Sequence, residues 1–194
     1  MNMPVLSTTE ITLIISLAVI VVAGIAGLLV LRKRRTERLR TQFGGAEYAR
    51  ALVEGGSRRH AEARLEGRAE RVEALHIRPL AAGDRARFAE SWRRVEGRFV
   101  DGPGGAVTEA DQLLRDVMST RGYPVTEFEQ RAADVSVDHP LVIENYRRAH
   151  EIALRQTRGQ ASTEDLRQAM IHYWTLFEDL SGEPELAHAR AASA

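Results

Sequence analysis

Histidine has the widest range of chemistry among the residues of this chain, because it binds metals and moves protons near neutral pH. The six histidines are His60, His76, His139, His150, His172 and His188. None has the His-Glu-x-x-His spacing of zinc enzymes, and no Glu-x-x-His pair lies within the predicted bundle at residues 81–181, where a di-iron site would require two. His150 and His172 fall on neighbouring predicted helices, but two ligands do not complete a metal site. The sequence therefore predicts no metal.

Other catalytic patterns are also missing from the sequence. The chain has no cysteine, which excludes disulfides, thiolate nucleophiles and cysteine-bound metal centres. The glycine-rich residues 102–105 lack the Lys-Ser/Thr of a phosphate-binding loop, and no serine stands in a Gly-x-Ser-x-Gly context. The acid pairs Asp134/Asp138 and Glu178/Asp179 have the character of solvated faces or helix caps. We predict no catalytic residue and no cofactor, and nothing in the sequence supports an enzymatic activity.

One alternative is a ligand-sensing or hydrolytic bundle. Its pocket would lie between the helices that carry Trp92, His150 and Tyr173. Trp92 shares its helical face with Phe88 and Phe99, which is more typical of a core anchor than of a ligand platform. A packed core would argue against this alternative, and a pocket with converging polar groups would favour it.

The longest apolar run in the chain, residues 11–31, contains neither charge nor proline. At about 1.5 Å per helical residue it covers roughly the 30 Å of a bilayer's hydrocarbon core. Basic residues follow it at once, at Arg32, Lys33, Arg34, Arg35, Arg38 and Arg40, whereas only Glu10 is charged before it. This asymmetry predicts one transmembrane helix with the amino terminus outside and the rest cytoplasmic. A cleaved signal peptide fits less well, because the charged n-region is missing and a basic stop follows.

Charge is unevenly distributed along the chain. Residues 41–194 carry 21 basic against 25 acidic side chains, so nucleic acid is not a predicted partner. The basic residues after the apolar run are suited to anionic headgroups, and membrane lipids are therefore predicted partners. Arginine dominates the basic residues, which is typical of a GC-rich coding sequence and favours a bacterial source. We accordingly expect the protein in the bacterial inner membrane.

Small residues lie together within the predicted span. Ala23, Gly24 and Gly27 include a small-xxx-small pair that lets two helices approach closely. Glycine is also common in membrane helices that do not associate. A homo-oligomer formed through this face is a second alternative, joined by a coiled coil of the segment that follows the span.

Apolar residues recur at helical spacing through the second half of the chain. Phe88, Trp92, Val95 and Phe99 share one face, and similar stripes cover residues 106–118, 128–135, 141–157 and 166–180. Helix caps are expected at Thr108, Thr126 and Ser162, and Gly122 and Gly159 mark helix ends. No stretch alternates long enough to predict a strand.

These patterns predict an all-α protein with a single transmembrane helix, a charged helical arm and a bundle of about five short amphipathic helices. The expected boundaries are an extracytoplasmic segment at residues 1–10, the span at 11–31, the basic collar and arm at 32–80, the bundle at 81–181 and a tail at 182–194. The arm has few large apolar residues and is expected to bury little area.

Several short motifs resemble a family of bacterial single-span membrane proteins without an established function. The motifs are Phe43-Gly44, Glu47-Tyr48, Ile77-Arg78-Pro79-Leu80, Arg121-Gly122-Tyr123-Pro124, residues 128–133, Asp138-His139-Pro140 and Tyr146-Arg147-Arg148-Ala149-His150. The resemblance implies a membrane anchor and a helical cytoplasmic module, and it implies no catalytic residue, cofactor or substrate.

A well-patterned bundle without a convergent catalytic set favours a membrane-tethered interaction or scaffold module with a protein partner. Tethering raises the effective concentration of such a module near other membrane proteins. The sequence does not identify the partner or the process.

Overall fold

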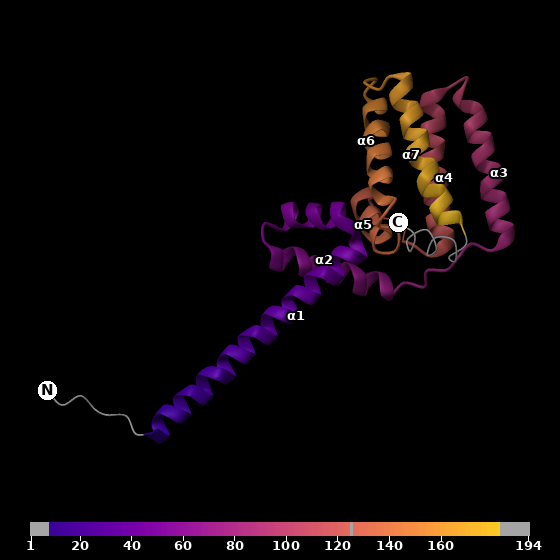
Figure 1. The fold of residues 1–194 in the computed structure, drawn as a ribbon. Coiled ribbons are helices and arrows are strands. Elements are labelled where there is room, and N and C mark those ends of the chain that lie inside the picture. Colours follow the sequence, from indigo (N-terminus) through magenta and orange to yellow (C-terminus); the bar gives the residue numbers. More distant parts are fainter. Residues whose placement is uncertain (1–7, 125, 183–194) are drawn as a thin grey trace.

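The computed structural model describes the backbone of residues 8–124 and 126–182, and the side chains of these residues except 8–16 and 18. The described residues form seven helices and no strand, which confirms the all-α prediction. The helices are α1 (Thr8–Gly55), α2 (Arg58–Glu73), α3 (Ala82–Phe99), α4 (Pro103–Arg121), α5 (Phe128–Asp138), α6 (Ile143–Thr157) and α7 (Thr163–Ser181). Figure 1 shows α1 projecting as a long rod from a body formed by the other helices.

The main core lies between α3, α4, α6 and α7, with the short α5 at the end nearest α1 (Figure 1). These helices match the five that the apolar stripes predict. Their largest fully buried side chains include Trp92, Leu114, Met118, Tyr146 and Tyr173. Each helix covers the apolar stripe of its neighbours, which is why the amphipathic period alone predicts the bundle.

Helix ends follow the expected chemistry at some positions and not at others. Ser162 forms a capping box with Asp165, and Gly122 ends α4 in the left-handed region at φ 102°. The expected cap at Thr108 is wrong, because α4 already begins at Pro103 and Thr108 bonds back to the Gly104 carbonyl. The cap at Thr126 is also wrong, since α5 has no side-chain cap bond. A proline at the first helical position provides the preset φ that starts α4 earlier.

Replacing Gly122 with alanine is expected to destabilise the fold by about 2 kcal/mol, because a non-glycine residue is strained at positive φ. An added Cβ would also lie 2.7 Å from the His76 carbonyl oxygen, and that oxygen belongs to the backbone. Urea unfolding of the full chain would measure the loss. Gly97→Ala is the matched control, since a Cβ at residue 97 meets nothing within 4 Å and alanine favours helix. Equal stability of the Gly122 and Gly97 variants would contradict the prediction.

A second, smaller core joins α1 to α2. It consists of Leu39, Phe43, Tyr48, Ala51, Ala61 and Leu65. Gly44 lies inside α1 with φ 70° and ψ 165°, so the helix kinks there and its last part turns back along α2. The segment expected to be an arm therefore has a small core of its own, and α2 and the end of α1 lie against α5.

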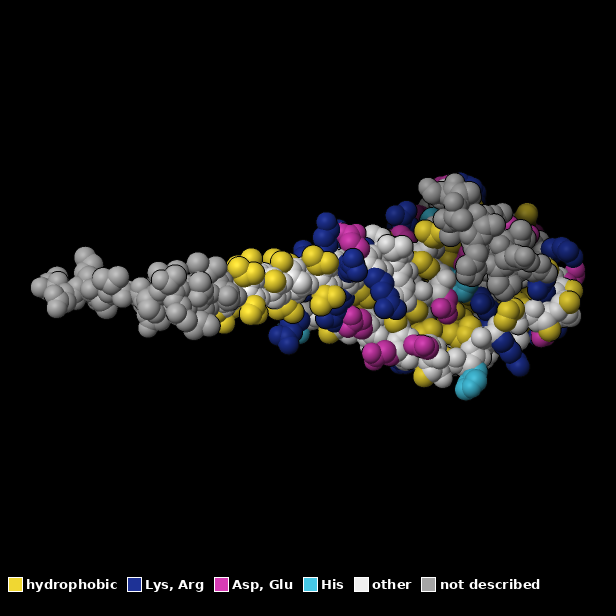
Figure 2. Space-filling model, turned by 60° about the horizontal axis from the view of Figure 1, so that its bottom comes forward, with side chains coloured by type: hydrophobic (Ala, Val, Ile, Leu, Met, Phe, Trp, Pro, Cys, Tyr) yellow, Lys and Arg dark blue, Asp and Glu magenta, His cyan; other side chains and the backbone are white. Residues whose placement is uncertain are grey.

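The predicted membrane span at residues 11–31 lies along the first part of α1. Residues 11–16 and 18 of this span fall outside the described side chains. Among the described residues, no helix combines the length and apolar character that a membrane crossing needs. The large apolar side chains from Leu17 to Leu31 are all 50–67% exposed, and Figure 2 shows them as a bare apolar surface outside the body.

Candidate functional site

The three residues of the suggested ligand pocket make three separate sets of contacts. Trp92 is 1% exposed, and its ring lies 5.2 Å from Trp174 and 5.1 Å from Phe177. Tyr173 is fully buried and donates a hydrogen bond of 3.2 Å to Asp111. His150 stacks on Phe128, with ring centroids 3.6 Å apart. Packed side chains surround the two buried aromatics, so the described residues do not bring the three together around one cavity.

Two buried tyrosines connect α4, α5, α6 and α7 through polar contacts. Tyr146 accepts a hydrogen bond from the Arg131 guanidinium at 2.8 Å, and its ring lies 6.2 Å from that of Tyr173. Burial raises the pKa of Tyr146 to about 12, and burial together with the Asp111 charge also raises the pKa of Tyr173. Both phenols therefore stay protonated at neutral pH and act as structural hydrogen-bonding groups.

Burial lowers the pKa of His150, and it does the same to His172, whose pKa the Arg148 charge lowers further. An unfolded histidine binds its proton near the ordinary value of 6.5, whereas the folded His150 binds it only at lower pH. The unfolded state therefore binds more protons between these two values, and stability is expected to fall as the pH drops below about 6.5. Urea midpoints at pH 8, 6.5 and 5.5 would measure this loss.

The matched variant for this pH dependence is His150→Gln, which keeps a polar side chain and removes the titration. Its midpoint should fall less between pH 8 and 5.5 than that of the natural chain. A variant with an unchanged pH dependence would show that His150 does not contribute to it.

The junction between α1, α2 and the bundle is built from buried ion pairs. Glu47 is 2% exposed, and its carboxylate lies 2.6 Å from Arg68 of α2 and 3.4 Å from Arg147 of α6. Asp134 of α5 is also buried and accepts from Arg71 of α2 at 2.9 Å. These pairs attach α1 and α2 to the bundle through charge as well as through apolar contact.

A second polar cluster closes the same end of the bundle. His139 bonds to Asp179 through Nδ1 and lies 3.0 Å from the Arg121 guanidinium through Nε2. Arg121 also donates to the Leu180 carbonyl at 3.2 Å, and Tyr123 donates to Asp138 at 2.8 Å. Both imidazole nitrogens are occupied by protein groups, so this histidine is held as a structural link between α5 and α7. The Asp138 and Asp179 carboxylates, expected on solvated faces or caps, take part in these links.

The basic residues predicted to meet the membrane fall into two groups. Arg35 pairs with Glu66 of α2, and the Arg40 guanidinium lies 5.1 Å from the centre of the Tyr48 ring. The side chains of the other four form no ion pair with any residue that the structure describes; they are Arg32, Lys33, Arg34 and Arg38. Figure 2 shows basic and acidic side chains gathered where the apolar part of α1 meets the body.

A groove of about 570 Å³ lies between α1 and α2 beside these basic residues. Its α1 wall carries Arg34, Arg35 and Arg38, and its α2 wall carries Glu66, Glu70 and Glu73. We refer to it as the Arg-Glu groove. Since Arg35 and Glu66 neutralise each other, the guanidinium groups of Arg34 and Arg38 and the carboxylates of Glu70 and Glu73 remain for other ligands.

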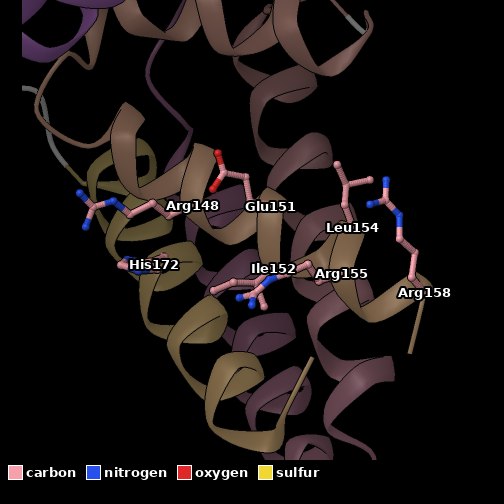
Figure 3. Close-up of a pocket in the computed structure, with 7 residues that line it drawn as sticks. All are labelled: Arg148, Glu151, Ile152, Leu154, Arg155, Arg158 and His172. Atoms are coloured by element: carbon pink, nitrogen blue, oxygen red, sulfur yellow. The ribbon is translucent and has the colours of Figure 1, made fainter. Parts of the chain in front are cut away.

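A shallow depression of about 470 Å³ lies on the outer face of α6 and α7 (Figure 3). Its lining includes Arg148, Arg155 and Arg158 together with Glu151 and His172 around Ile152. Arg148 pairs with Glu144 and Arg155 with Asp165, whereas Arg158 forms no ion pair among the described residues. Leu154, another lining residue, and the nearby Ile171 are each 44% exposed. Figure 3 shows Arg148 and Arg158 on opposite sides of the depression, with Arg155 beside Ile152 between them.

The small residues of the span lie on the exposed part of α1. Ala23, Gly24 and Gly27 are exposed, and a Cβ added at either glycine would meet nothing within 4 Å. The described residues therefore leave this face uncovered, and the predicted association through it stays a prediction.

Comparison of the chain with protein-family models, with curated proteins and with solved structures finds no match. The resemblance of its motifs to single-span membrane proteins therefore stays a prediction, and what the structure itself establishes is an all-helical fold of seven helices in the described residues.

Proposed function

We propose that this protein is a membrane-tethered helical interaction module, with residues 11–31 as its anchor and the bundle on the cytoplasmic side. The observation that carries the proposal is the continuity of α1. The exposed apolar stretch ends at Leu31, and the same helix becomes buried at Thr36 and enters the small core at Leu39 and Phe43. An apolar rod of this length outside the body needs an apolar environment to cover it.

This continuity makes the tether rigid. Leu39 follows Leu31 by eight helical residues, which is about 12 Å along the axis. The headgroup region on one side of a bilayer is about 5–7 Å thick, so the body would begin just beyond it. Arg32, Lys33, Arg34 and Arg35 would then lie at headgroup depth, about 1.5–6 Å beyond Leu31, as the positive-inside rule requires.

Membrane fractionation tests the anchor. We expect the full chain to stay with membranes after washing at alkaline pH, and a variant in which Ile20 and Val21 are both arginine to be released, because charges at the centre of the span are costly in lipid. Val100 is 85% exposed on the bundle, so a Val100→Arg control should stay membrane-bound. Release of the unaltered full chain would contradict the proposal.

The basic depression on α6 and α7 is the proposed docking surface for an acidic protein segment with an apolar anchor. Charge complementarity across an interface mainly sets partner choice and association rate. Co-purification from native membranes should therefore identify a partner that Arg148→Glu/Arg158→Glu loses. The matched control is Arg93→Glu/Arg94→Glu on α3, where both arginines are exposed and paired with Glu90. No difference between the two double variants would exclude this surface.

A further inference from the structure

We propose that the Arg-Glu groove binds the headgroup of a zwitterionic aminophospholipid, namely phosphatidylethanolamine. The inference rests on the proposed membrane anchor and adds the class of lipid that the anchored protein selects. The groove lies beside the point where α1 leaves its apolar stretch, and Arg34 to Arg38 follow Leu31 by about 4–10 Å along the helix. Arg34 would thus lie at headgroup depth, and the long side chain of Arg38 would reach back toward it from the water side.

The phosphate of the lipid would be bound from the α1 wall. Arg34 and Arg38 are four residues apart, so they lie on the same side of the helix, and both line the groove. Neither forms an ion pair with any residue in the described part of the chain. Guanidinium groups bind phosphate oxygens through charge-assisted, often bidentate hydrogen bonds.

The amine of the lipid would be bound from the α2 wall. Glu70 and Glu73 are exposed on the last turns of α2, and their carboxylates have no cationic partner among the described residues. Arg35 is unavailable as a partner for them, because it is paired with Glu66. An ethanolamine ammonium carries three N–H donors that two carboxylates can accept, and it lies on the same headgroup as the phosphate.

The two walls together distinguish between lipid classes. A groove of arginines alone would accept any phosphate, and an anionic glycerol headgroup would bind best to it. Glu70 and Glu73 repel a headgroup with net negative charge and have no such effect on a neutral one. Choline is also neutral, but its methylated nitrogen has no N–H to donate. The arrangement therefore favours ethanolamine over both choline and glycerol headgroups.

Lipid retention by the full chain tests the proposal. The protein in detergent would be mixed with equal amounts of phosphatidylethanolamine, phosphatidylcholine and phosphatidylglycerol with identical acyl chains, and bound lipid counted by native mass spectrometry. We expect the protein to retain about fivefold more ethanolamine lipid than choline lipid. This ratio corresponds to the binding free energy of one charge-assisted contact at a partly exposed site. Equal retention of the two lipids would overturn the proposal.

Matched variants locate the selectivity. Glu70→Gln/Glu73→Gln should bring the ethanolamine-to-choline ratio to about one and raise retention of the glycerol lipid. Arg34→Gln/Arg38→Gln should lower retention of all three lipids. Glu96→Gln/Glu151→Gln removes two exposed carboxylates of the bundle and should keep the fivefold ratio. A preference that survives the Glu70/Glu73 substitutions would show that the groove is not its source.

Flotation of the same protein with vesicles separates this inference from the proposed function. A chain that floats with all vesicles but shows no ethanolamine preference would overturn the groove proposal alone. A chain that floats with none would overturn the membrane anchor and, with it, the lipid proposal.

Discussion

Replacing Glu47 with alanine is expected to lower the free energy of unfolding by about 3–5 kcal/mol, because it leaves buried guanidinium groups without their counter-charge. Arg68 and Arg147 have side chains only 9% and 5% exposed, and Glu47 is the carboxylate between them. Arg147 keeps Glu129, whose side chain is 76% exposed, whereas Arg68 keeps no ion-pair partner among the described residues. Urea unfolding of the full chain in detergent, followed by tryptophan fluorescence, would measure the change.

The control for this prediction is Glu54→Ala, which removes another carboxylate from the same part of α1. Glu54 pairs with Arg64, but both side chains are more than a third exposed, so the loss should be below about 1 kcal/mol. A Glu47 variant as stable as the Glu54 variant would contradict the buried network at the junction.

Trp92→Ala is expected to cost about 3–5 kcal/mol, because it leaves a large cavity in the main core. The Trp92 ring contacts Trp174 and Phe177 of α7, and it thereby joins α3 to α7 across the bundle. A tryptophan held open for a ligand would make a smaller contribution to folding. Thermal or urea unfolding of the full chain would therefore distinguish a core anchor from a ligand platform.

Trp174→Ala serves as the comparison, since Trp174 belongs to the same aromatic group but is 37% exposed. Its replacement should cost clearly less than that of Trp92, because less area is buried in the folded state. Equal losses at the two positions, or a Trp92 loss below about 1 kcal/mol, would refute the core assignment.

The bundle could be predicted from the sequence because each of its helices has a complete apolar stripe. Phe88, Trp92 and Val95 recur at helical spacing on α3 and are all buried, and the other bundle helices follow the same rule. Helix termini were less predictable, since a Thr-x-x-acid pattern also occurs inside helices such as α4. There the hydroxyl bonds back to the preceding turn instead of capping.

The buried charges could not be predicted, because in a charged helical sequence a buried Glu or Asp looks the same as one on a solvent-exposed face. Glu47 meets Arg147 across 100 positions in sequence, and Asp134 meets Arg71 across 63. The only local signal was the position of Glu47, which lies four residues after Phe43 and four before Ala51 and so shares a helical face with two apolar residues.

The Arg-Glu groove was only half predictable for the same reason. The basic side of the groove follows directly from the positive-inside pattern after the apolar run. The acidic side depends on how α2 crosses α1, and that crossing depends on the kink at Gly44. A helical pattern specifies which residues share one face and does not specify which distant helix will lie against it.

Cysteine labelling in intact cells tests most directly whether residues 11–31 anchor the bundle on the cytoplasmic side of the membrane. Because the chain has no native cysteine, only the introduced residues can react. Single cysteines at Asn2→Cys and Val100→Cys would be exposed to a maleimide that cannot cross membranes. If residues 11–31 span the inner membrane as proposed, the reagent labels residue 2 once it reaches the outer face of that membrane, and labels residue 100 only after the cells are lysed. Labelling of residue 100 in intact cells would contradict the account.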